Sequence, residues 1–430
     1  MDNLSDRYAC SHSGSCALAG AAAFFAGIED AHIVINGQLW CYFYAQRRVE
    51  RQCPAAGERM LCTYIDSTAI VYGTENELLE SLSQVKRIAS PAVVAVINSC
   101  AVSLIGDDTA GIAVQAGLKC PMVCVDSSGL YGGYTEGYQA AAKAYFNQMP
   151  LAGGLEVKPL TVNLLGCTLG YYHGQADLAE VVRLLNLGGC AVNAVPGGGS
   201  AVREIALMRQ AELNIVLHRE LGEDLARILY DRYHIPFLTL PPPYGIEGTV
   251  KWAEAVFESL SAKPSGRCCL AQEAGTLARE LHQILLSVQR LWGNLWFDRI
   301  VAAGPTSVAM AIGQAVRFEL ADTRRLAVIL HEHSFRPQPV SGIDAVFAYT
   351  ADSMVQAELV CLQGGLLLGS SSETARLRQL GVKMLAKQNI ALPVLDEVVI
   401  RPRPFAGLEG MRYLTECLWN GFIQLQGQMD

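Results

Sequence analysis

The sequence predicts an α/β protein built from three Rossmann-like, doubly wound domains with parallel sheets. Short apolar runs of strand length alternate along the chain with longer stretches that have helical spacing of apolar residues. The runs are continuously apolar rather than alternating, which is typical of parallel strands covered by helices on both faces. The chain has 430 residues, and at ~150 residues per domain this length favours three domains.

The first series of elements occupies the N-terminal third. An Ala-rich run over residues 16–28 predicts a buried helix, and residues 31–35 predict the strand that follows it. Further buried strands are predicted at residues 91–97 and 121–126. The Gly- and Pro-containing segment 149–154 then separates this series from the next, which places the first predicted domain at residues 1–152.

The second and third series repeat the same alternation. Strands of the second series are predicted at residues 161–166, 190–195, 213–217 and 236–240, with helices at 176–187 and 200–211. A long helix is predicted at 270–296, because this stretch has no proline and its apolar residues recur every three or four positions. The third series then has strands at 299–303, 326–330, 345–349 and 392–395. The predicted domains are residues 153–265 and 266–430.

Composition excludes several classes of function. Lys and Arg minus Asp and Glu gives 33 − 41 = −8, and no basic tract is present. Binding to nucleic acid or to anionic membranes needs clustered cations, so neither is expected. The longest apolar run near the N-terminus, 13 residues, is shorter than the ~20 residues of a membrane span, and no basic segment of a secretory signal precedes it. We expect a cytoplasmic protein.

The absence of several sequence motifs excludes further classes of enzyme. The chain has no phosphate-binding loop, no dinucleotide fingerprint after a strand, no nucleophile elbow and no H-E-x-x-H zinc motif. Its 14 cysteines include no C-x-x-C pair, so a metal site would draw its cysteines from distant segments. The run Gly197–Ser200 follows a predicted strand and either binds an anion on helix N–H groups or only makes a tight turn.

Three cysteines fall at the ends of predicted elements in the N-terminal third. Cys16 begins a helix, Cys41 follows the strand at 31–35, and Cys100 follows the strand at 91–97. Loops converge at the carboxyl ends of parallel strands, and thiolates there could share an iron–sulfur cluster. Three separate buried thiols explain the same positions equally well.

These segments resemble the nitrogenase component 1 superfamily, which includes nitrogenase subunits, their cofactor scaffolds and protochlorophyllide reductases. The resemblance is specific from Cys16 to Asp108 and includes the segment after Val71 and the glycines from Gly129 to Gly137. It implies that Cys16, Cys41 and Cys100 ligate a 4Fe–4S or 8Fe–7S (P-cluster type) cluster at a subunit interface. A homologous subunit, in a homodimer, heterodimer or α2β2 assembly, would supply the remaining ligands.

The chain departs from the resemblance at the second, catalytic cofactor. His218 occupies the position that resembles the cofactor cysteine, and no histidine follows His333. His218 is then a structural histidine, a general acid or an unusual ligand. The segment with His331, His333 and Arg336 follows a strand. It binds an anionic substrate or cofactor, delivers protons, or is only a solvated polar loop. We expect His218 and Arg336 to line one cavity.

Together these observations predict an oxidoreductase subunit. By the resemblance, the chain is the catalytic component of a nitrogenase-like two-component reductase, and a separate ATP-dependent iron–sulfur reductase passes electrons to its cluster. A second metallocofactor could take part. The alternative is a non-catalytic scaffold that holds and transfers a maturing metallocluster.

Overall fold

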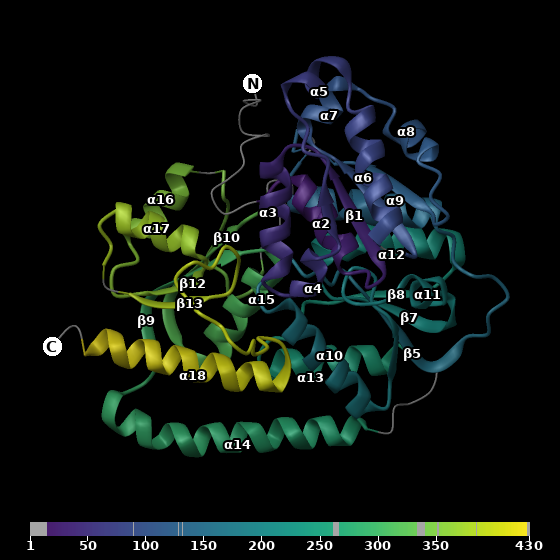
Figure 1. Cartoon of the computed structure of the whole chain (residues 1–430). Helices are drawn as coiled ribbons and strands as arrows, with labels where there is room; N and C mark the ends of the chain where they lie inside the picture. Colours follow the sequence, from purple (N-terminus) through teal and green to yellow (C-terminus); the bar gives the residue numbers. More distant parts are fainter. Residues whose placement is uncertain are drawn as a thin grey trace.

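The computed structural model describes residues 15–88, 90–127, 129–130, 132–260, 266–332, 340–350, 352–383 and 385–427. Within these residues the strands form three sheets, and every strand pair is parallel. Helices lie around each sheet (Figure 1). The predicted class, an α/β protein with three parallel sheets, is therefore confirmed. Each sheet lies inside one of the three predicted domain ranges, whereas the borders between domains stay predictions.

The first sheet has strand order β2-β1-β3-β4. Its strands are β1 (Ala31–Asn36), β2 (Met60–Cys62), β3 (Val93–Asn98) and β4 (Met122–Asp126). Its helices are α2 (Ala17–Ala26), α3 (Leu39–Glu50), α4 (Pro54–Gly57), α5 (Ser67–Tyr72), α6 (Glu75–Ile88), α7 (Cys100–Ile105), α8 (Thr109–Gln115) and α9 (Tyr134–Gln148). Every residue of α2 is buried, as the Ala-rich run predicts, because small side chains let α9 pack closely against it.

The second sheet has strand order β6-β5-β7-β8. Its elements are β5 (Lys158–Leu165), α10 (Gly174–Gly188), β6 (Ala191–Ala194), α11 (Val202–Ala206), the 3₁₀ turn η1 (Met208–Gln210), β7 (Ala211–Val216), α12 (Arg219–Tyr233), β8 (Phe237–Thr239) and α13 (Ile246–Glu258). The helix predicted over 200–211 is wrong in length. The buried Asn163 side chain donates to the carbonyl of Met208, and the chain enters β7 at Ala211.

The third sheet has strand order β11-β10-β9-β12-β13. Its elements are α14 (Arg267–Trp292), β9 (Trp296–Gly304), α15 (Thr306–Ala315), the π turn η2 (Val316–Leu320), β10 (Asp322–Leu330), β11 (Ala345–Ala348), α16 (Asp352–Val360), β12 (Leu366–Gly369), α17 (Ser371–Gln379), β13 (Ala386–Asn389) and α18 (Gly407–Gln426). The strand predicted at 392–395 is wrong, and β13 precedes it. Pro393 has no N–H to donate to a ladder, and this segment instead lines a cavity.

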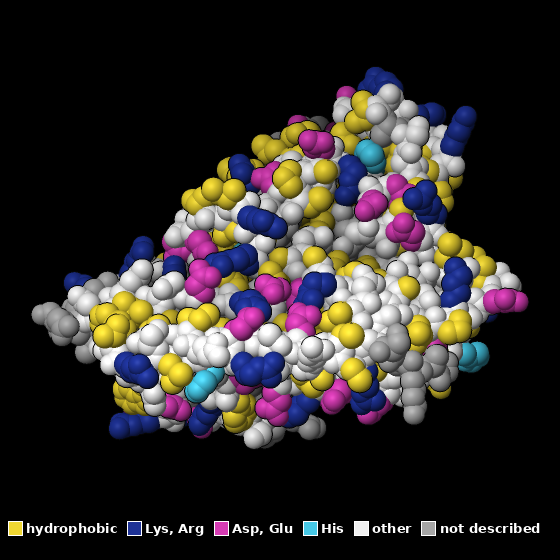
Figure 2. Space-filling model, turned by 90° about the horizontal axis from the view of Figure 1, so that it is seen from below, with side chains coloured by type: hydrophobic (Ala, Val, Ile, Leu, Met, Phe, Trp, Pro, Cys, Tyr) yellow, Lys and Arg dark blue, Asp and Glu magenta, His cyan; other side chains and the backbone are white. Residues whose placement is uncertain are grey.

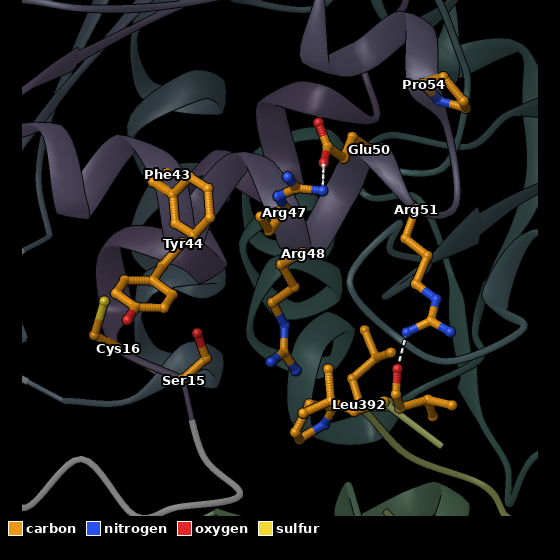
Figure 3. Close-up of a pocket in the computed structure, with 13 residues that line it drawn as sticks. Ser15, Cys16, Phe43, Tyr44, Arg47, Arg48, Glu50, Arg51, Pro54 and Leu392 are labelled. Carbon is orange, nitrogen blue, oxygen red and sulfur yellow. Dashed lines mark hydrogen bonds and ion pairs between the residues drawn. The ribbon is translucent and has the colours of Figure 1, made fainter. Parts of the chain in front are cut away.

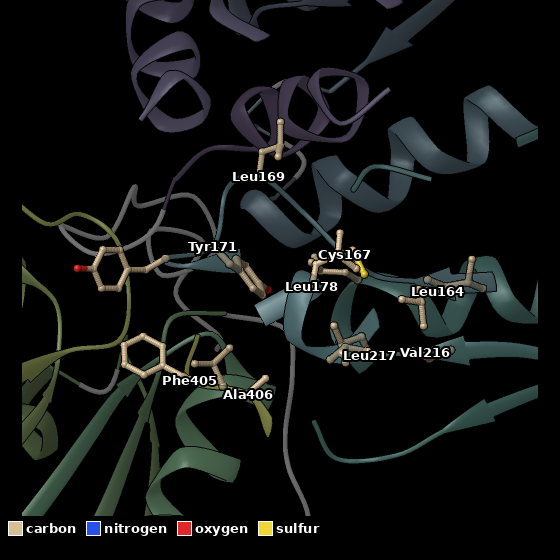
Figure 4. Close-up of a cluster of buried hydrophobic side chains, with 14 of the residues drawn as sticks. Leu164, Cys167, Leu169, Tyr171, Leu178, Val216, Leu217, Phe405 and Ala406 are labelled. Carbon is tan, nitrogen blue, oxygen red and sulfur yellow. The ribbon is translucent and has the colours of Figure 1, made fainter. Parts of the chain in front are cut away.

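The C-terminal segment joins the second and third sheets. Helix α18 packs against α10, α13 and α14 as well as β13, and α14 and α18 lie side by side in Figure 1. The buried Asp177 carboxylate of α10 accepts from the backbone N–H groups of Phe405 and Ala406. Figure 4 shows Phe405 and Ala406 in the same hydrophobic cluster as Tyr171 and Leu217. The two sheets therefore share one continuous core.

The surface seen from below carries mixed charge. In Figure 2 Lys and Arg side chains are interspersed with Asp and Glu, and hydrophobic side chains form separate patches between them. No helix within the described residues is both long enough and apolar enough to cross a membrane.

Candidate functional site

Each of the three candidate cysteines lies where a helix begins. Cys16 is the residue before α2, Cys41 lies in the first turn of α3, and Cys100 is the first residue of α7. The strands β1 and β3 lead into α3 and α7, and they are neighbours in the sheet. The carboxyl end of the sheet therefore presents Cys41 and Cys100 side by side, as the sequence predicts.

Two asparagines fix these strand ends. Asn36 ends β1 and Asn98 ends β3 in register, and the Nδ2 of Asn36 donates to the Oδ1 of Asn98 over 3.2 Å. The amide of Asn98 in turn donates to the Oγ1 of Thr109 over 2.9 Å. Both asparagines are buried, so a lost partner would leave an unsatisfied polar group inside the protein. This pair sets the relative position of the two cysteine loops.

Glycines let the loops approach closely. A Cβ on Gly37 would lie 2.6 Å from the Cβ of Ser99 and 3.8 Å from the Cβ of Cys41. A Cβ on Gly129 would lie 3.2 Å from the Cβ of Cys16 and 3.5 Å from the Sγ of Cys100. The backbone N–H of Gly129 donates to that same Sγ over 3.2 Å. The structure therefore brings Cys16, Cys41 and Cys100 to one place.

Electrostatic interactions between the neighbouring cysteine side chains shift the pKa of Cys41. Burial raises the pKa of Cys41 to about 11, and the neighbouring Cys16, Cys100 and Cys62 add to the rise. Thiolates crowded in this way need a cation between them, so the donor set fits an iron–sulfur cluster.

Cys62 is a neighbour that the sequence patterns do not single out. It ends β2, where it pairs in register with Ile35 of β1, and its burial raises its pKa. Its Sγ accepts from the N–H of Tyr64 and donates to the carbonyl of Gly37, both over 3.4 Å. A predicted strand at residues 60–62 would have placed Cys62 beside the other cysteines.

The described residues do not form a complete site for a single metal ion. Among them, no group of three or more His, Cys, Asp or Glu side chains is arranged to hold one ion. A polynuclear cluster differs, because each thiolate binds a different iron atom and the ligands lie further apart. The cysteine arrangement fits part of such a cluster site, and further ligands would have to come from elsewhere.

The helices that follow the cysteine loops carry exposed apolar side chains. We call this set the apolar collar; its members are Leu39, Trp40, Tyr44, Val71, Tyr72 and Leu104. They lie on α3, α5 and α7, with Trp40 64% and Tyr72 85% exposed. An exposed group of large apolar residues marks a surface for another macromolecule.

His218 lies at the junction of the second and third sheets. It follows β7 and precedes α12, and its Nδ1 is 2.7 Å from the Oγ of Ser307 in α15. Because the Ser307 hydroxyl donates to Glu220 over 2.8 Å, its oxygen accepts from Nδ1–H of His218. Burial lowers the pKa of His218 to about 3. The imidazole is therefore neutral, and its ring lies edge-on to Tyr171.

Two buried carboxyls at this junction are not indicated by the sequence. Glu332 accepts from the backbone N–H and the hydroxyl of Thr306, and Glu220 accepts from Ser307, so both lie at the start of α15. Burial raises the pKa of both, and for Glu332 the nearby Glu220 raises it further, to about 8. No local motif reveals this pairing, because Glu220 and Glu332 lie more than a hundred residues apart.

Of the other predicted site residues, the structure describes His331 and the run Gly197–Ser200. His331 follows directly after β10, and its Nε2 is 3.1 Å from the Oε1 of the buried Glu373. His333 and Arg336 lie outside the described residues, so the cavity expected between His218 and Arg336 stays a prediction. In the run Gly197–Ser200, the N–H of Gly199 donates to Gly27 and the hydroxyl of Ser200 accepts from Val195. These contacts favour the tight turn over the anion site.

Comparisons with known proteins agree with the cysteine pattern. The family model described as nitrogenase component 1 type oxidoreductase matches residues 16–423. The B subunit of light-independent protochlorophyllide reductase from Methylobacterium sp. (strain 4-46) is 27% identical over 76% of this chain and 64% of its own length. The nitrogenase molybdenum-iron protein alpha chain of Methanosarcina barkeri is 30% identical over 55% of this chain and 46% of its own.

A third relative has a different role. The nitrogenase iron-molybdenum cofactor biosynthesis protein NifE of Methanococcus maripaludis is 27% identical over 57% of this chain and 51% of its own length. The matches to these three relatives thus span between about half and just under two thirds of their lengths. Among solved structures, nitrogenase Cp1 at pH 6.5 superposes with a TM-score of 0.77 at 16% identity, covering 96% of this chain and 93% of that one. The latter comparison shows a shared fold.

Proposed function

This chain belongs to the nitrogenase component 1 type oxidoreductase family, and from that membership we propose that it is the catalytic subunit of a two-component reductase. A separate ATP-hydrolysing iron–sulfur protein would deliver single electrons to a cluster on this chain. The chain has no phosphate-binding loop of its own, which suits a division in which the reductase component binds ATP.

One observation carries the proposal, namely the convergence of Cys16, Cys41 and Cys100 around Gly129. These thiolates would hold a 4Fe–4S or an 8Fe–7S cluster, which accepts and passes on one electron at a time. The chain's own part is to hold the three thiolates at fixed positions and to donate the Gly129 N–H to the sulfur of Cys100. Hydrogen bonds to cluster sulfurs are one means by which a protein sets a reduction potential.

A homologous subunit would complete the site. The three cysteines leave ligand positions to be filled, and the apolar collar lies on the helices that follow the cysteine loops. A second component 1 chain, identical or related, packed on the collar would cover it and bring its own cysteines to the cluster. The assembly would be a dimer or an α2β2 tetramer in the cytoplasm.

The junction of the second and third sheets is the proposed reaction site. We assign His218 and Arg336 as catalytic residues and His331 and His333 as residues that hold a substrate or a second metallocofactor. The neutral imidazole of His218 and the carboxyls of Glu220 and Glu332 form a buried proton-holding group there. Such a group suits a reduction in which protons accompany electrons.

A scaffold for metallocluster assembly is the second candidate. It is favoured by the cofactor biosynthesis protein among the relatives and by the lack of any histidine after His333. A scaffold would hold the same cluster cysteines but would release a metallocluster to another protein. The two candidates therefore differ in what leaves the complex, a reduced product or a cluster.

The experiment is anaerobic purification of the chain with its neighbouring homologous subunit, followed by iron analysis and electron paramagnetic resonance. Replacement of Cys16, Cys41 or Cys100 by Ala should remove most of the iron, whereas Cys361→Ala, an exposed cysteine in the third sheet region, should not. Iron that is unchanged in all three variants contradicts the cluster. ATP-dependent turnover with a reductase component supports the enzyme, and iron transfer to an apo-protein without turnover supports the scaffold.

A further inference from the structure

A large cavity opens beside Cys16. Its volume is about 1150 Å³, slightly larger than the ~300–1,000 Å³ typical of small-molecule sites. Figure 3 shows Cys16 and Ser15 on one side, α3 above, and Leu392 with its neighbours opposite. An inorganic ion alone would leave most of this space empty, so the size points to an organic ligand.

The cavity carries an excess of positive charge. Arg47, Arg48 and Arg51 line it, and Glu50 is the one carboxylate among the described lining residues. Glu50 forms an ion pair with Arg47 at 3.0 Å. Neither Arg48 nor Arg51 has an ion pair with a described residue. Two guanidinium charges therefore face the cavity without a compensating carboxylate.

Both of these arginines are held in place. The guanidinium of Arg48 lies 4.5 Å from the ring centre of Tyr134, and its Nε is buried without a hydrogen-bond partner. In Figure 3 its side chain points into the space between Ser15 and Leu392. Arg51 donates to the backbone carbonyls of Val394 and Glu397, which orients the group but leaves its charge intact. Fixed guanidinium groups favour carboxylates and phosphates, which accept two hydrogen bonds at once.

The remaining walls are apolar. Phe43 and Tyr44 form one side, and Leu392, Val394 and Leu395 form the other. An aromatic and aliphatic lining with a few charged groups is typical of a site that takes an apolar body with a polar head. We propose that this cavity binds an amphipathic organic anion, with its carboxylate or phosphate on Arg48 and Arg51 and its apolar body between α3 and residues 392–395.

The position beside Cys16 gives the cavity a role. A ligand here would lie in contact with Cys16, which we assign to the cluster, and the described lining residues do not include His218 of the proposed reaction site. The ligand would therefore be an organic anion held beside the cluster, distinct from the substrate reduced at the junction of the second and third sheets. This role rests on the proposed function, whereas binding of the anion does not. Binding can therefore be tested without a working cluster.

The test measures the affinity of the full chain for two fluorescent probes by titration. The anionic probe is 1-anilinonaphthalene-8-sulfonate, and the neutral analogue is N-phenyl-1-naphthylamine. The double variant Arg48→Gln/Arg51→Gln should bind the anionic probe at least about tenfold more weakly, because two charge-assisted contacts are lost. Its affinity for the neutral probe should stay unchanged. The matched control is Arg219→Gln/Arg227→Gln, which removes two exposed charges on α12 and should leave both affinities as in the parent.

Displacement by octanoate and by octyl phosphate identifies the head group. The compound that displaces the anionic probe at lower concentration names the preferred anion, and displacement by neither overturns the proposal. Equal loss of both probes, or equal weakening in the control, also overturns it. If the double variant does not fold, Leu395→Glu serves instead, because Leu395 is 84% exposed at the rim and a carboxylate there repels the anion.

Iron content separates the two hypotheses. The double variant should keep the iron of the parent, and Cys41→Ala should lose iron but keep the anionic probe. If the parent protein contains iron but does not bind the probe, only the cavity proposal is contradicted. If the parent binds the probe but contains no iron, only the proposed cluster is contradicted.

Discussion

The backbone N–H of Gly129 donates to the Sγ of Cys100 across 3.2 Å. The same glycine lies against Cys16, because a Cβ there would be 3.2 Å from the Cβ of Cys16. Gly129 follows β4 in the chain, so the first sheet brings the loops after β3 and β4 together with the start of α2. One residue without a side chain therefore sets the spacing between two of the three candidate cluster ligands.

Gly129→Ala should weaken cluster binding. The added methyl group would press on Cys16 and Cys100, and overpacking of this kind costs roughly 1–3 kcal/mol. We expect less iron per chain after anaerobic purification, with a circular dichroism spectrum like that of the parent. Gly248→Ala is the control, since a Cβ at Gly248 in α13 meets no atom within 4 Å. Equal iron in both variants would show that Gly129 does not limit the site.

Asn98→Ala should destabilise the first sheet by about 1–3 kcal/mol, because it leaves buried hydrogen-bonding groups of Asn36 and Thr109 unpaired. Urea unfolding of the parent, Asn98→Ala, Asn36→Ala and the double variant forms a cycle. The two changes should be less than additive, since either one breaks the same bond. Additive losses would mean that the pair does not hold the strand ends together.

Local patterns predict most of the fold but not its edges. The buried strand β3 and the C-terminal half of β10 are continuous apolar runs, so their place is visible in the sequence. The edge strand β13 has the sequence Ala-Lys-Gln-Asn, although three of its four residues are buried. Its polar side chains are tolerated there because they have partners, since the amide of Asn389 donates to Asp396 and Glu397. Apolar patterning therefore favours the run at 392–395 over the true strand.

The candidate site likewise contains residues that the sequence predicts and residues that it does not. Cys16, Cys41 and Cys100 lie at element ends that hydrophobic patterning locates. Gly129 belongs to the glycines that carry the family resemblance, but its contact with Cys100 and that of Cys62 with Cys41 join segments that are adjacent only in space. No spacing rule in one sequence reveals these contacts. The Glu220 and Glu332 pair is similar, since it depends on how β7 and β10 lead to the start of α15.

Glu332→Gln should stabilise the protein at alkaline pH. The folded pKa of Glu332 is raised to about 8 by burial and by Glu220, so between pH 4.5 and 8 the folded state holds a proton that the unfolded state has released. Stability therefore falls as the pH rises through this window, by ~1.4 kcal/mol for each pH unit. Gln cannot ionise and still accepts from Thr306. Urea midpoints of the variant should change less than those of the parent from pH 5.5 to 8.5.

The control for this change is Glu254→Gln, which replaces an exposed carboxyl on α13. Its urea midpoint should depend on pH as steeply as that of the parent. A Glu332→Gln variant with the same slope as the parent would mean that Glu332 is already ionised in the folded protein.

His218→Gln should reduce the sensitivity to acid. Burial lowers the folded pKa of His218 from 6.5 to about 3, so below pH 6.5 the unfolded chain takes up a proton that the folded chain does not. Stability is then lost as the pH falls, by roughly 2 kcal/mol at pH 5 for this one group. The variant should lose less stability than the parent between pH 7 and pH 5. His282→Gln, on an exposed face of α14, should behave like the parent.

Trp40→Ser tests the apolar collar as a subunit interface. Trp40 is 64% exposed and packs edge-on against Phe43 of its own helix, so its loss should change the free energy of unfolding of the single chain by no more than ~0.5 kcal/mol. Tryptophans at the centre of an interface often contribute ~2 kcal/mol or more to binding. Sedimentation equilibrium should therefore show an assembly with its homologous subunit that is weakened about thirtyfold. The control is Leu291→Ser, which removes an apolar side chain that is 81% exposed at the end of α14, a helix that carries no collar residue. If both variants assemble like the parent, the collar is not the interface and the remaining cluster ligands must reach Cys16, Cys41 and Cys100 by another surface.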